Sequence, residues 1–213
     1  MHALLRVDGG PVLEHAMTRV CESHVTNVVV ATSTLPQDDV VEQCAPEFGA
    51  DVIRGSELDV FSWFEEILER YDPDNVVRVS ADCPLVSPKF IDASIQRINE
   101  SATEYVSAGL ERTFPRGVTC EAFTAESFEQ VCTESTEPHH RGLVTPYYRE
   151  HPEKFELSNF DSCAVFDEPW PQDRTDFRFP LDEPDNYHLL ETVYREMGYD
   201  RMLEIRDAIN YIE

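Results

Sequence analysis

Two aspartates stand just after stretches that predict buried β-strands. Asp82 closely follows NVVRVS at residues 75–80, and Asp182 follows FRFPL at residues 177–181. Ligands of open parallel sheets bind beyond the carboxyl ends of the strands, where a carboxylate could hold a divalent cation that bridges phosphates. The structural alternative is that Asp82 caps a turn and that Asp182 caps the next helix, for which Asp is a preferred residue. For Asp182 both roles are compatible if one oxygen caps the helix and the other faces the metal.

Two arginines lie at predicted turns where an anion could bind. Arg54 lies two residues before Ser56, between a predicted strand and a predicted helix start, and Arg116 lies at a turn with Glu121 beyond it. An arginine near a helix N-terminus favours a phosphate or a carboxylate. The alternative is a solvated arginine among acidic residues, which is the usual state of a surface arginine.

A third polar cluster is the run His139-His140-Arg141, which resembles a metal or base site in composition. Adjacent residues on a helix point in different directions. We therefore expect these histidines to contact a ligand or solvent rather than to share a metal.

The apolar residues predict alternating helices and strands over the first hundred positions. The β-branched run at 25–31 and the stretch at 75–80 are typical of buried strands. Ser56, with Asp59 three residues later, predicts a helix start as in a capping box. The resulting order αβαβαβα is that of a parallel sheet covered by helices. Helices are expected at 11–24, 38–48, from 56 and from 87, and strands at 25–31, 51–53 and 75–80.

Beyond Glu104 the pattern loosens into short strands mixed with helices. We expect a single domain over residues 1–213, with one sheet and an added antiparallel part that could serve contacts in a homodimer. The expected strands are 105–108, 118–123, 155–160 and 177–181, and the expected helices lie near 125–134, 140–150, 184–197 and 200–210.

The charge of the chain excludes some classes of partner. Seventeen Lys and Arg against 42 Asp and Glu give a formal net charge of −25 over 213 residues. This charge excludes two classes of protein, those that bind nucleic acid through a basic surface and those that dock on anionic lipid. It does not exclude a protein that binds a small anion through a few local arginines. Lys89 and Lys154 are the only lysines. An acidic surface poor in lysine is typical of a protein from a halophilic source, because high salt screens the self-repulsion.

Several familiar motifs are missing from the sequence. The six cysteines form no CxxC pair and no Cys/His cluster with zinc spacing, which favours buried thiols in a reducing cytoplasm. No apolar run reaches the ~18 residues of a membrane-spanning helix, and no signal peptide is visible, so we expect a cytoplasmic protein. The eight glycines form neither GxGxxG nor GxxxxGK[ST], and there is no GxSxG elbow.

Seven stretches, taken in their order and spacing, resemble the cytidylyltransferase family that includes the spore coat polysaccharide biosynthesis F-type proteins. That family is related to the synthetases that activate acylneuraminate and 3-deoxy-manno-octulosonate as CMP-sugars. The resemblance runs along almost the whole chain. The stretches are GGPVLEH (9–15), VVVATS (28–33), RGSELDV (54–60), VVRVSADCPLVSP (76–88), FPRGVTCEAF (114–123), VTPYYREHPEKF (144–155) and FRFPLDEPDNY (177–187).

The resemblance implies a Rossmann-like α/β fold of the nucleotide-diphospho-sugar transferase type, with a mostly parallel sheet and helices on both faces. It implies transfer of CMP from CTP to a hydroxyl of an acidic sugar, with release of pyrophosphate, for a surface polysaccharide or glycan. Asp82 and Asp182 match the family's metal-binding positions and would hold Mg²⁺. The residues expected to bind nucleotide or sugar are Arg54, Ser56, Asp59, Arg78, Arg116, Glu121 and Arg141.

The sequence also departs from the family's pattern. Family members open with a strand and a loop rich in Gly, Arg and Lys, and Met1 begins just after the place where that loop would end. We expect the loss of a central strand to open a gap between its neighbours. Either the true start lies upstream, or this is a short form that rearranges. Four single residues also differ from the family's usual ones, namely Trp63, Ala81, Thr119 and Leu143.

Two alternative functions follow. One is a non-catalytic homologue that binds a nucleotide or a sugar and acts with a full-length partner. The other is a glycosyltransferase on the same type of sheet, which needs a DxD metal motif. The only match is Asp72-Pro73-Asp74, in a predicted loop before a strand, so we discount it.

Overall fold

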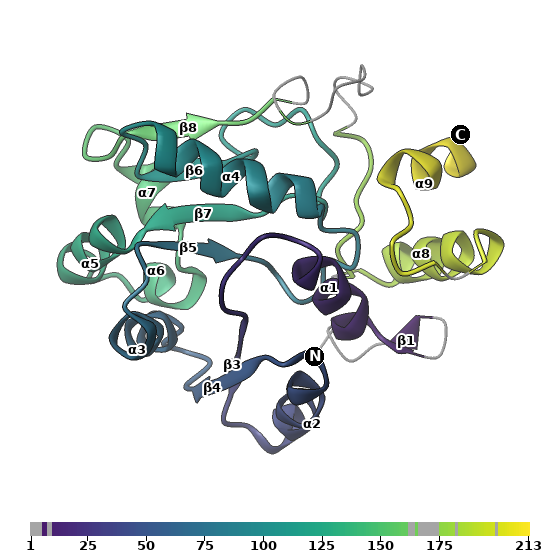
Figure 1. Ribbon diagram of the computed structural model, residues 1–213, viewed down its shortest axis with the longest axis horizontal. Helices are drawn as coiled ribbons and strands as arrows, with labels where there is room; N and C mark the ends of the chain where they lie inside the picture. Colours follow the sequence, from purple (N-terminus) through teal and green to yellow (C-terminus); the bar gives the residue numbers. More distant parts are fainter. Residues whose placement is uncertain (1–5, 8–9, 162–164, 166–174, 182, 199) are drawn as a thin grey trace.

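From α1 to α4 helices and strands alternate, and beyond Glu104 the order becomes less regular, as the sequence predicts. The computed structural model describes residues 6–7, 10–161, 165, 175–181, 183–198 and 200–213 (Figure 1). The strands are β1 (Arg6–Val7), β2 (Gly10–Pro11), β3 (Val29–Ser33), β4 (Asp51–Gly55), β5 (Asn75–Arg78), β6 (Tyr105–Ser107), β7 (Glu121–Thr124) and β8 (Leu157–Asn159). The α-helices are α1 (Val12–Cys21), α2 (Asp39–Cys44), α3 (Phe61–Tyr71), α4 (Pro88–Glu100), α5 (Ala125–Glu134), α6 (Pro138–Leu143), α7 (Pro146–Glu150), α8 (Pro184–Glu196) and α9 (Ile205–Ile212).

The larger sheet has four strands in the order β5-β7-β6-β8. Strand β7 runs antiparallel to both of its neighbours, while β6 and β8 are parallel. Strands β3 and β4 form a separate parallel pair. The predicted α/β class, with parallel pairing and covering helices, is confirmed. The predicted antiparallel part lies inside the sheet, and it leaves β5 and β6 running in the same direction.

The strand register sorts the side chains of this sheet onto two faces, because successive residues of a strand point to opposite sides. Two neighbouring rows of the register are Val77, Ala122 and Val106, and then Val76, Phe123 and Tyr105. The first row belongs to a core that also contains Phe90 and Ile91 of α4. Helix α4 lies over β6 and β7 of this sheet (Figure 1). The second row belongs to an aromatic core shared with α3, α5 and α7.

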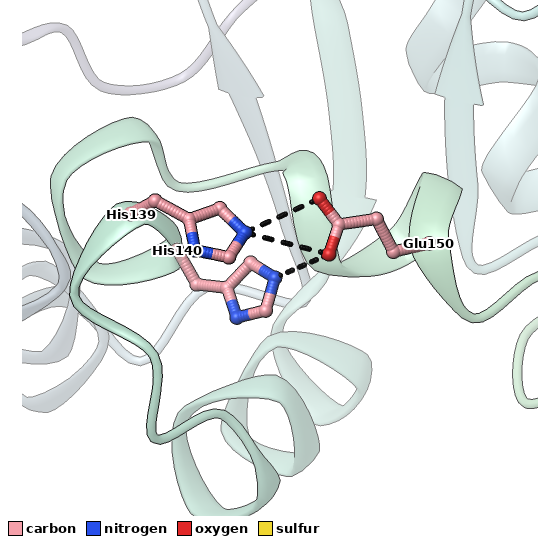
Figure 2. Close-up of side chains that lie close together, drawn as sticks. All are labelled: His139, His140 and Glu150. Atoms are coloured by element: carbon pink, nitrogen blue, oxygen red, sulfur yellow. Dashed lines mark hydrogen bonds and ion pairs between the residues drawn. The ribbon is translucent and has the colours of Figure 1, made fainter.

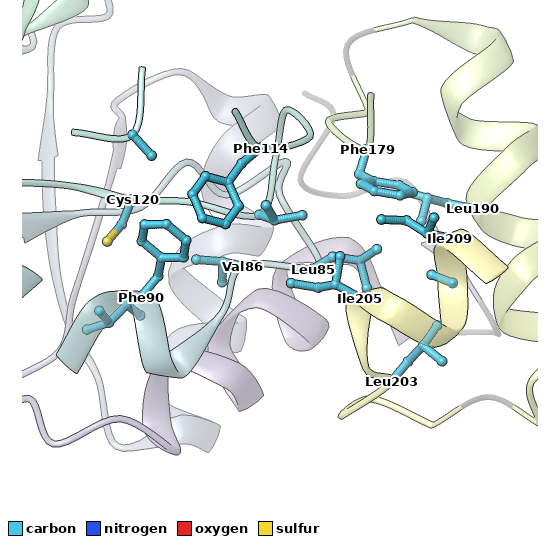
Figure 3. Packing of buried hydrophobic residues seen from close by; sticks show 14 of the residues in the cluster. Leu85, Val86, Phe90, Phe114, Cys120, Phe179, Leu190, Leu203, Ile205 and Ile209 are labelled. Carbon is cyan, nitrogen blue, oxygen red and sulfur yellow. The ribbon is translucent and has the colours of Figure 1, made fainter. Parts of the chain in front are cut away.

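The C-terminal helices α8 and α9 pack against the core that contains Phe90 and Ile91 of α4. Figure 3 shows Leu190 of α8 and Ile205 and Ile209 of α9 lying toward Leu85, in the same cluster as Phe90. All of these side chains are at most 3% exposed, so their burial drives the docking of α8 and α9.

A buried arginine ties the first helix to this C-terminal part. Arg19 of α1 is 3% exposed. Its guanidinium donates to three backbone carbonyls, those of Val86 at 2.6 Å, Leu203 at 3.0 Å and Arg201 at 3.3 Å. Burial lowers the pKa of Arg19. The three carbonyls supply the hydrogen bonds that a buried cation requires.

The small β3–β4 sheet has a core of its own with α1 and α2, built on residues such as Leu13, Val30 and Val41. Within the part of the chain that the structure describes, no strand pairing joins it to the larger sheet.

Several predicted elements have other bounds in the structure. The helix expected from Ser56 begins at Phe61, because Asp59 N–H donates to Ser56 O at 3.1 Å and closes a turn first. The strand expected at 25–31 is β3, shifted toward its carboxyl end. The strand expected at 177–181 is reduced to a single bridge between Arg116 and Arg178.

The helix expected at 140–150 is split into α6 and α7. Pro146 has no N–H with which to continue a helix. Val144 adopts φ 75° and ψ −58°, and Thr145 N–H donates to Leu143 O at 3.0 Å. This is a γ-turn of the positive-φ type, which is rare and strained for a β-branched residue.

Candidate active site

The predicted site residues Arg78 and Glu121 meet at one edge of the larger sheet. Arg78 ends β5, Glu121 begins β7 and Ser107 ends β6, and the three lie in register. Because β5 and β6 run in the same direction, this edge holds the carboxyl ends of two parallel strands. The structure therefore brings these residues to the edge at which the sequence predicts a site.

Glu121 is the centre of a dense group of hydrogen bonds. Its carboxylate accepts from Tyr105 Oη at 2.5 Å and from Thr145 Oγ1 at 2.9 and 3.0 Å. It also accepts from Arg78 at 2.8 Å and from Arg149 at 3.0 Å. A carboxylate offers about four lone-pair positions, so that of Glu121 is essentially saturated.

The electrostatic setting keeps Glu121 ionised. Burial alone would raise the pKa of Glu121, but the charge of Arg78, the hydrogen bond from Tyr105 and the charge of Arg149 together hold it below the ordinary value. Burial, with the charge of Glu121 next, raises the pKa of Tyr105. Tyr105 is thus a neutral donor and Glu121 a charged acceptor, and neither is poised to exchange a proton near pH 7.

Further arginines gather next to this carboxylate. Burial and then the charges of Arg116, Arg149 and Arg178 lower the pKa of Arg112, and among the leading influences only Glu121 opposes them. Arg112 and Arg116 lie in one short stretch, whereas Arg149 and Arg178 come from distant parts of the chain. Positive charge exceeds negative charge in this group, although the whole chain carries −25. Such a group can bind an anion.

The γ-turn at Val144 places two of the residues that contact Glu121. Thr145 follows the turn directly, and Arg149 lies on α7, one helical turn further on. Val144 itself is fully buried in the aromatic core. Strained residues of this kind persist where the surrounding packing determines their conformation.

Asp82, the predicted metal ligand, lies on the loop after β5 and is partly buried. Its Oδ1 accepts a weak hydrogen bond from Cys83 Sγ at 3.4 Å. Leu181 N–H donates to the backbone carbonyl of Asp82 at 3.1 Å, so the segment at 177–181 runs beside this loop. The second predicted ligand, Asp182, lies outside the described residues. A partly accessible carboxylate fits Mg²⁺, which takes one or two carboxylates together with phosphate oxygens.

Arg116 is exposed, and its backbone holds the segment that carries Arg178. Arg116 N–H donates to Phe177 O at 3.1 Å, and Phe179 N–H donates to Arg116 O at 3.0 Å. The next residue, Gly117, has φ 88°, and a Cβ there would lie 2.8 Å from Pro180. Only glycine fits this position, which brings the two arginine-bearing segments together.

The remaining predicted residues occupy other places. Arg54 is enclosed by acidic and carbonyl groups, at 2.7 Å from both Asp39 and Glu42 and with hydrogen bonds to the carbonyls of residues 33 and 35. Ser56 is exposed and accepts from Leu58 N–H at 3.3 Å. Neither residue contacts the Glu121 group through any of these bonds.

Asp59 and Arg141 form a pair with each other. Nε and Nη2 of Arg141 lie 2.7 Å from Asp59 Oδ1, and the guanidinium lies 5.3 Å from the centroid of the Phe61 ring. This pair fixes α6 to the start of α3 and leaves little of the guanidinium for a ligand.

The expectation that His139 and His140 point apart is wrong. Their ring centroids are 3.9 Å apart. Figure 2 shows Nε2 of both rings directed at Glu150 of α7. The two residues form the first turn of a short helix, and both side chains reach across to α7.

The sequence did not single out Tyr105, Arg112, Thr145, Arg149 and Arg178 as site residues. Thr145, Arg149 and Arg178 lie within two of the stretches that carry the family resemblance, and this was the available signal. The separations between contacting residues, such as 44 positions between Tyr105 and Arg149, explain why local patterns miss them.

The surface hollow lined by Glu104 and residues 152–157 contains none of the predicted site residues. Among the described residues, none of the helices has the length and apolar character needed to cross a membrane.

Comparison with known proteins places these features in context. A family model described as cytidylyltransferase matches residues 2–206. The spore coat polysaccharide biosynthesis protein SpsF of Bacillus subtilis is 26% identical over 173 residues, 81% of this chain and 68% of that protein. The 3-deoxy-manno-octulosonate cytidylyltransferase of Chromohalobacter salexigens is 30% identical over 109 residues, 49% of this chain and 41% of that protein.

Among solved structures, a cytidylyltransferase from Leptospira borgpetersenii is similar with a TM-score of 0.88 and 26% identity, over 99% of this chain and 86% of that one. The curated relatives are longer than the parts matched here. An uncharacterised protein of Methanocaldococcus jannaschii, 30% identical over 72% of this chain, is matched over 63% of its own length.

Proposed function

This chain belongs to the cytidylyltransferase family, and on that premise we propose that it transfers CMP from CTP to a hydroxyl of an acidic sugar, with release of pyrophosphate. The product would serve the synthesis of a surface polysaccharide or glycan. The relatives named for spore coat polysaccharide biosynthesis and for 3-deoxy-manno-octulosonate support this choice.

The observation that carries the proposal is the excess of arginine at the sheet edge. Arg112 is close enough to Arg116, Arg149 and Arg178 for their charges to lower its pKa. Two carboxylates partly balance these arginines, Glu121 at 3.0 Å from Arg149 and Glu183 at 3.7 Å from Arg178. Such an arrangement costs free energy unless an anion completes it. A triphosphate and a sugar carboxylate are both anions that arginine binds with charge-assisted hydrogen bonds.

Within this proposal Glu121 is a positioning residue. Its oxygens are already occupied by donors from β5, β6, α7 and the turn before α7, and its pKa is lowered. It therefore orients Arg78 and Arg149 rather than removing a proton from the sugar hydroxyl. Orientation of this kind lowers the barrier by fixing the reacting groups in line.

Mg²⁺ fits the proposal through Asp82, with Asp182 as the second proposed ligand. When bound, the ion would neutralise charge on the phosphates and on the departing pyrophosphate. Asp82 would hold it with the carboxylate oxygens, and the backbone bond between Asp82 and Leu181 fixes the loop on which that carboxylate sits.

The test is pyrophosphate release by the full chain with CTP, Mg²⁺ and a panel of sugars. Acidic sugars, including 3-deoxy-manno-octulosonate and an acylneuraminate, should be used and neutral sugars should not. Asp82→Asn should reduce turnover at least about 100-fold, as expected for loss of an electrostatic group at the reacting phosphates. The matched control is Asp92→Asn, which changes a partly exposed carboxylate paired with His24 and should leave turnover unchanged.

Release of pyrophosphate with neutral sugars alone would contradict the acidic substrate. Binding of CTP or a sugar acid without any turnover across the panel would instead favour the non-catalytic homologue. A cytoplasmic location, a halophilic source, a homodimer and a single domain over residues 1–213 stay predictions from the sequence.

A further inference from the structure

A cluster of metal-binding side chains lies between α6 and α7, apart from the group around Glu121. Nε2 of His139 lies 3.3 and 3.4 Å from the two oxygens of Glu150, and Nε2 of His140 lies 2.8 Å from Oε2 (Figure 2). One ligand atom from each residue can be chosen so that all lie within 4.8 Å of one another. We propose that His139, His140 and Glu150 form a binding site for Zn²⁺. This inference is independent of the proposed function.

The spacing between each histidine nitrogen and the glutamate oxygens suits a tetrahedral ion. Zinc binds imidazole nitrogen and carboxylate oxygen at about 2.0–2.2 Å, so neighbouring ligand atoms of a tetrahedral site lie about 3.3 Å apart. The distances from His139 to Glu150 already have this value. The distance from His140 to Glu150 needs to lengthen by a few tenths of an ångström, which a half-exposed glutamate can supply by rotation.

The donor set selects the class of metal. Two imidazole nitrogens and one carboxylate oxygen suit zinc and similar transition metals, whereas magnesium and calcium prefer oxygen alone. Three protein ligands leave the fourth position to water. The His139 and Glu150 side chains are 50% and 48% exposed, so an ion can enter from solvent.

The surroundings of His140 set the strength of binding. Its side chain is 4% exposed, and its Nδ1 is buried without a hydrogen-bond partner among the described residues. A metal on Nε2 places the proton on Nδ1, where an acceptor would normally orient the ring. Missing partners of this kind reduce metal affinity about 10- to 100-fold. We therefore expect a dissociation constant on the order of micromolar rather than nanomolar.

The ion would clamp the two helices that flank the strained turn. His139 and His140 lie before Val144 and Glu150 lies after it, so a shared ion closes a loop around the γ-turn. Thr145 and Arg149 on the same segment contact Glu121. Zinc bound here would hold both contacts in place without touching the substrate.

The test is calorimetric titration of the full chain with zinc sulfate, together with thermal unfolding with and without zinc. We expect one ion per chain and a rise in Tm. His139→Ala and Glu150→Gln should each weaken binding at least tenfold and remove the rise. Both side chains are half-exposed, so these variants should fold. The matched control, His24→Ala, removes an exposed histidine paired with Asp92 and should bind zinc as the natural chain does.

Cobalt substitution identifies the ligands. A tetrahedral site of nitrogen and oxygen gives visible d–d bands without the intense near-ultraviolet band of a cobalt–thiolate bond. A thiolate band would assign the metal to cysteines and overturn the proposal. Absence of zinc binding at 100 micromolar metal, about a hundred times the expected dissociation constant, or binding by His139→Ala as tight as that of the natural chain, would overturn it equally.

Discussion

Two groups of arginine and carboxylate in this molecule have opposite stoichiometry. Around Glu121, several arginines surround one buried carboxylate. Around Arg54, two exposed carboxylates, Asp39 and Glu42, surround one arginine. In the first group the arginines outnumber the carboxylates, so positive charge is left to attract an anionic ligand. In the second group two carboxylates neutralise the single arginine. Arginines that look equivalent in the sequence are therefore distinguished by what the fold places around them.

The largest effect should come from removing the carboxylate at each group. Glu121→Gln leaves Arg78 and Arg149 without their counter-charge, and it should lower the free energy of unfolding by about 2–3 kcal/mol, since both arginines are partly exposed. Glu42→Gln removes an exposed partner of Arg54 and should cost less than about 0.5 kcal/mol. Urea unfolding of both variants measures the difference, and equal losses would erase the contrast between the two groups.

The second effect concerns substrate. Arg112→Met should lower kcat/KM for the acidic sugar about 10- to 100-fold, the value of a hydrogen bond to a charged group. Arg54→Met should leave kcat/KM of the folded protein within about twofold, because this guanidinium is committed to Asp39, Glu42 and two carbonyls. Steady-state pyrophosphate release at saturating CTP separates the two variants. A loss in Arg54→Met as large as that in Arg112→Met would show that both groups bind substrate.

The third effect is on the pH dependence of stability. The pKa of Glu121 in the folded protein lies below the ordinary value of 4.5. A carboxyl with a lowered pKa contributes stability that is complete above its unfolded value and is lost as pH falls through its folded value. The free energy of unfolding of the natural chain should therefore fall more steeply below about pH 4.5 than that of the Glu121→Gln variant. Parallel curves for the two proteins between pH 3 and 6 would contradict the lowered pKa.

The smallest effect tests the strained turn that supports the Glu121 group. Val144→Ala loses buried methyl groups and keeps the positive φ, so it should destabilise by about 2 kcal/mol. Val144→Gly loses one carbon more but relieves about 1–2 kcal/mol of backbone strain. The Val144→Gly variant should therefore be at least as stable as the Val144→Ala variant. At an ordinary buried position alanine is the more stable of the two. Thermal unfolding of the pair measures the sign, and a glycine variant about 1 kcal/mol less stable than alanine would show that the turn is unstrained.

The sequence predicted the layers of the fold well, because burial follows short-range periodicity. The run at 75–80 and the apolar stripe beginning at Pro88 became β5 and α4. It also placed Arg78 and Glu121 in one site, through the family resemblance. Tyr105, Thr145 and Arg112 were missed because their roles arise from strand register and from a γ-turn that no propensity scale favours for valine. Arg54 and Ser56 were predicted from their turn positions, yet nearby acids or backbone groups occupy them.

The three carbonyls that bind Arg19 come from residue 86 and from residues 201 and 203. During synthesis on the ribosome, α1 emerges long before residues 201 and 203, so its guanidinium has at most one of these acceptors until those residues have been translated. Helix α1 cannot complete its docking until residues 201 and 203 have been made, so an element translated early reaches its final contacts late. A nascent chain stalled before residue 201 would keep this cation hydrated and leave the hydrophobic surface beneath it open to chaperones.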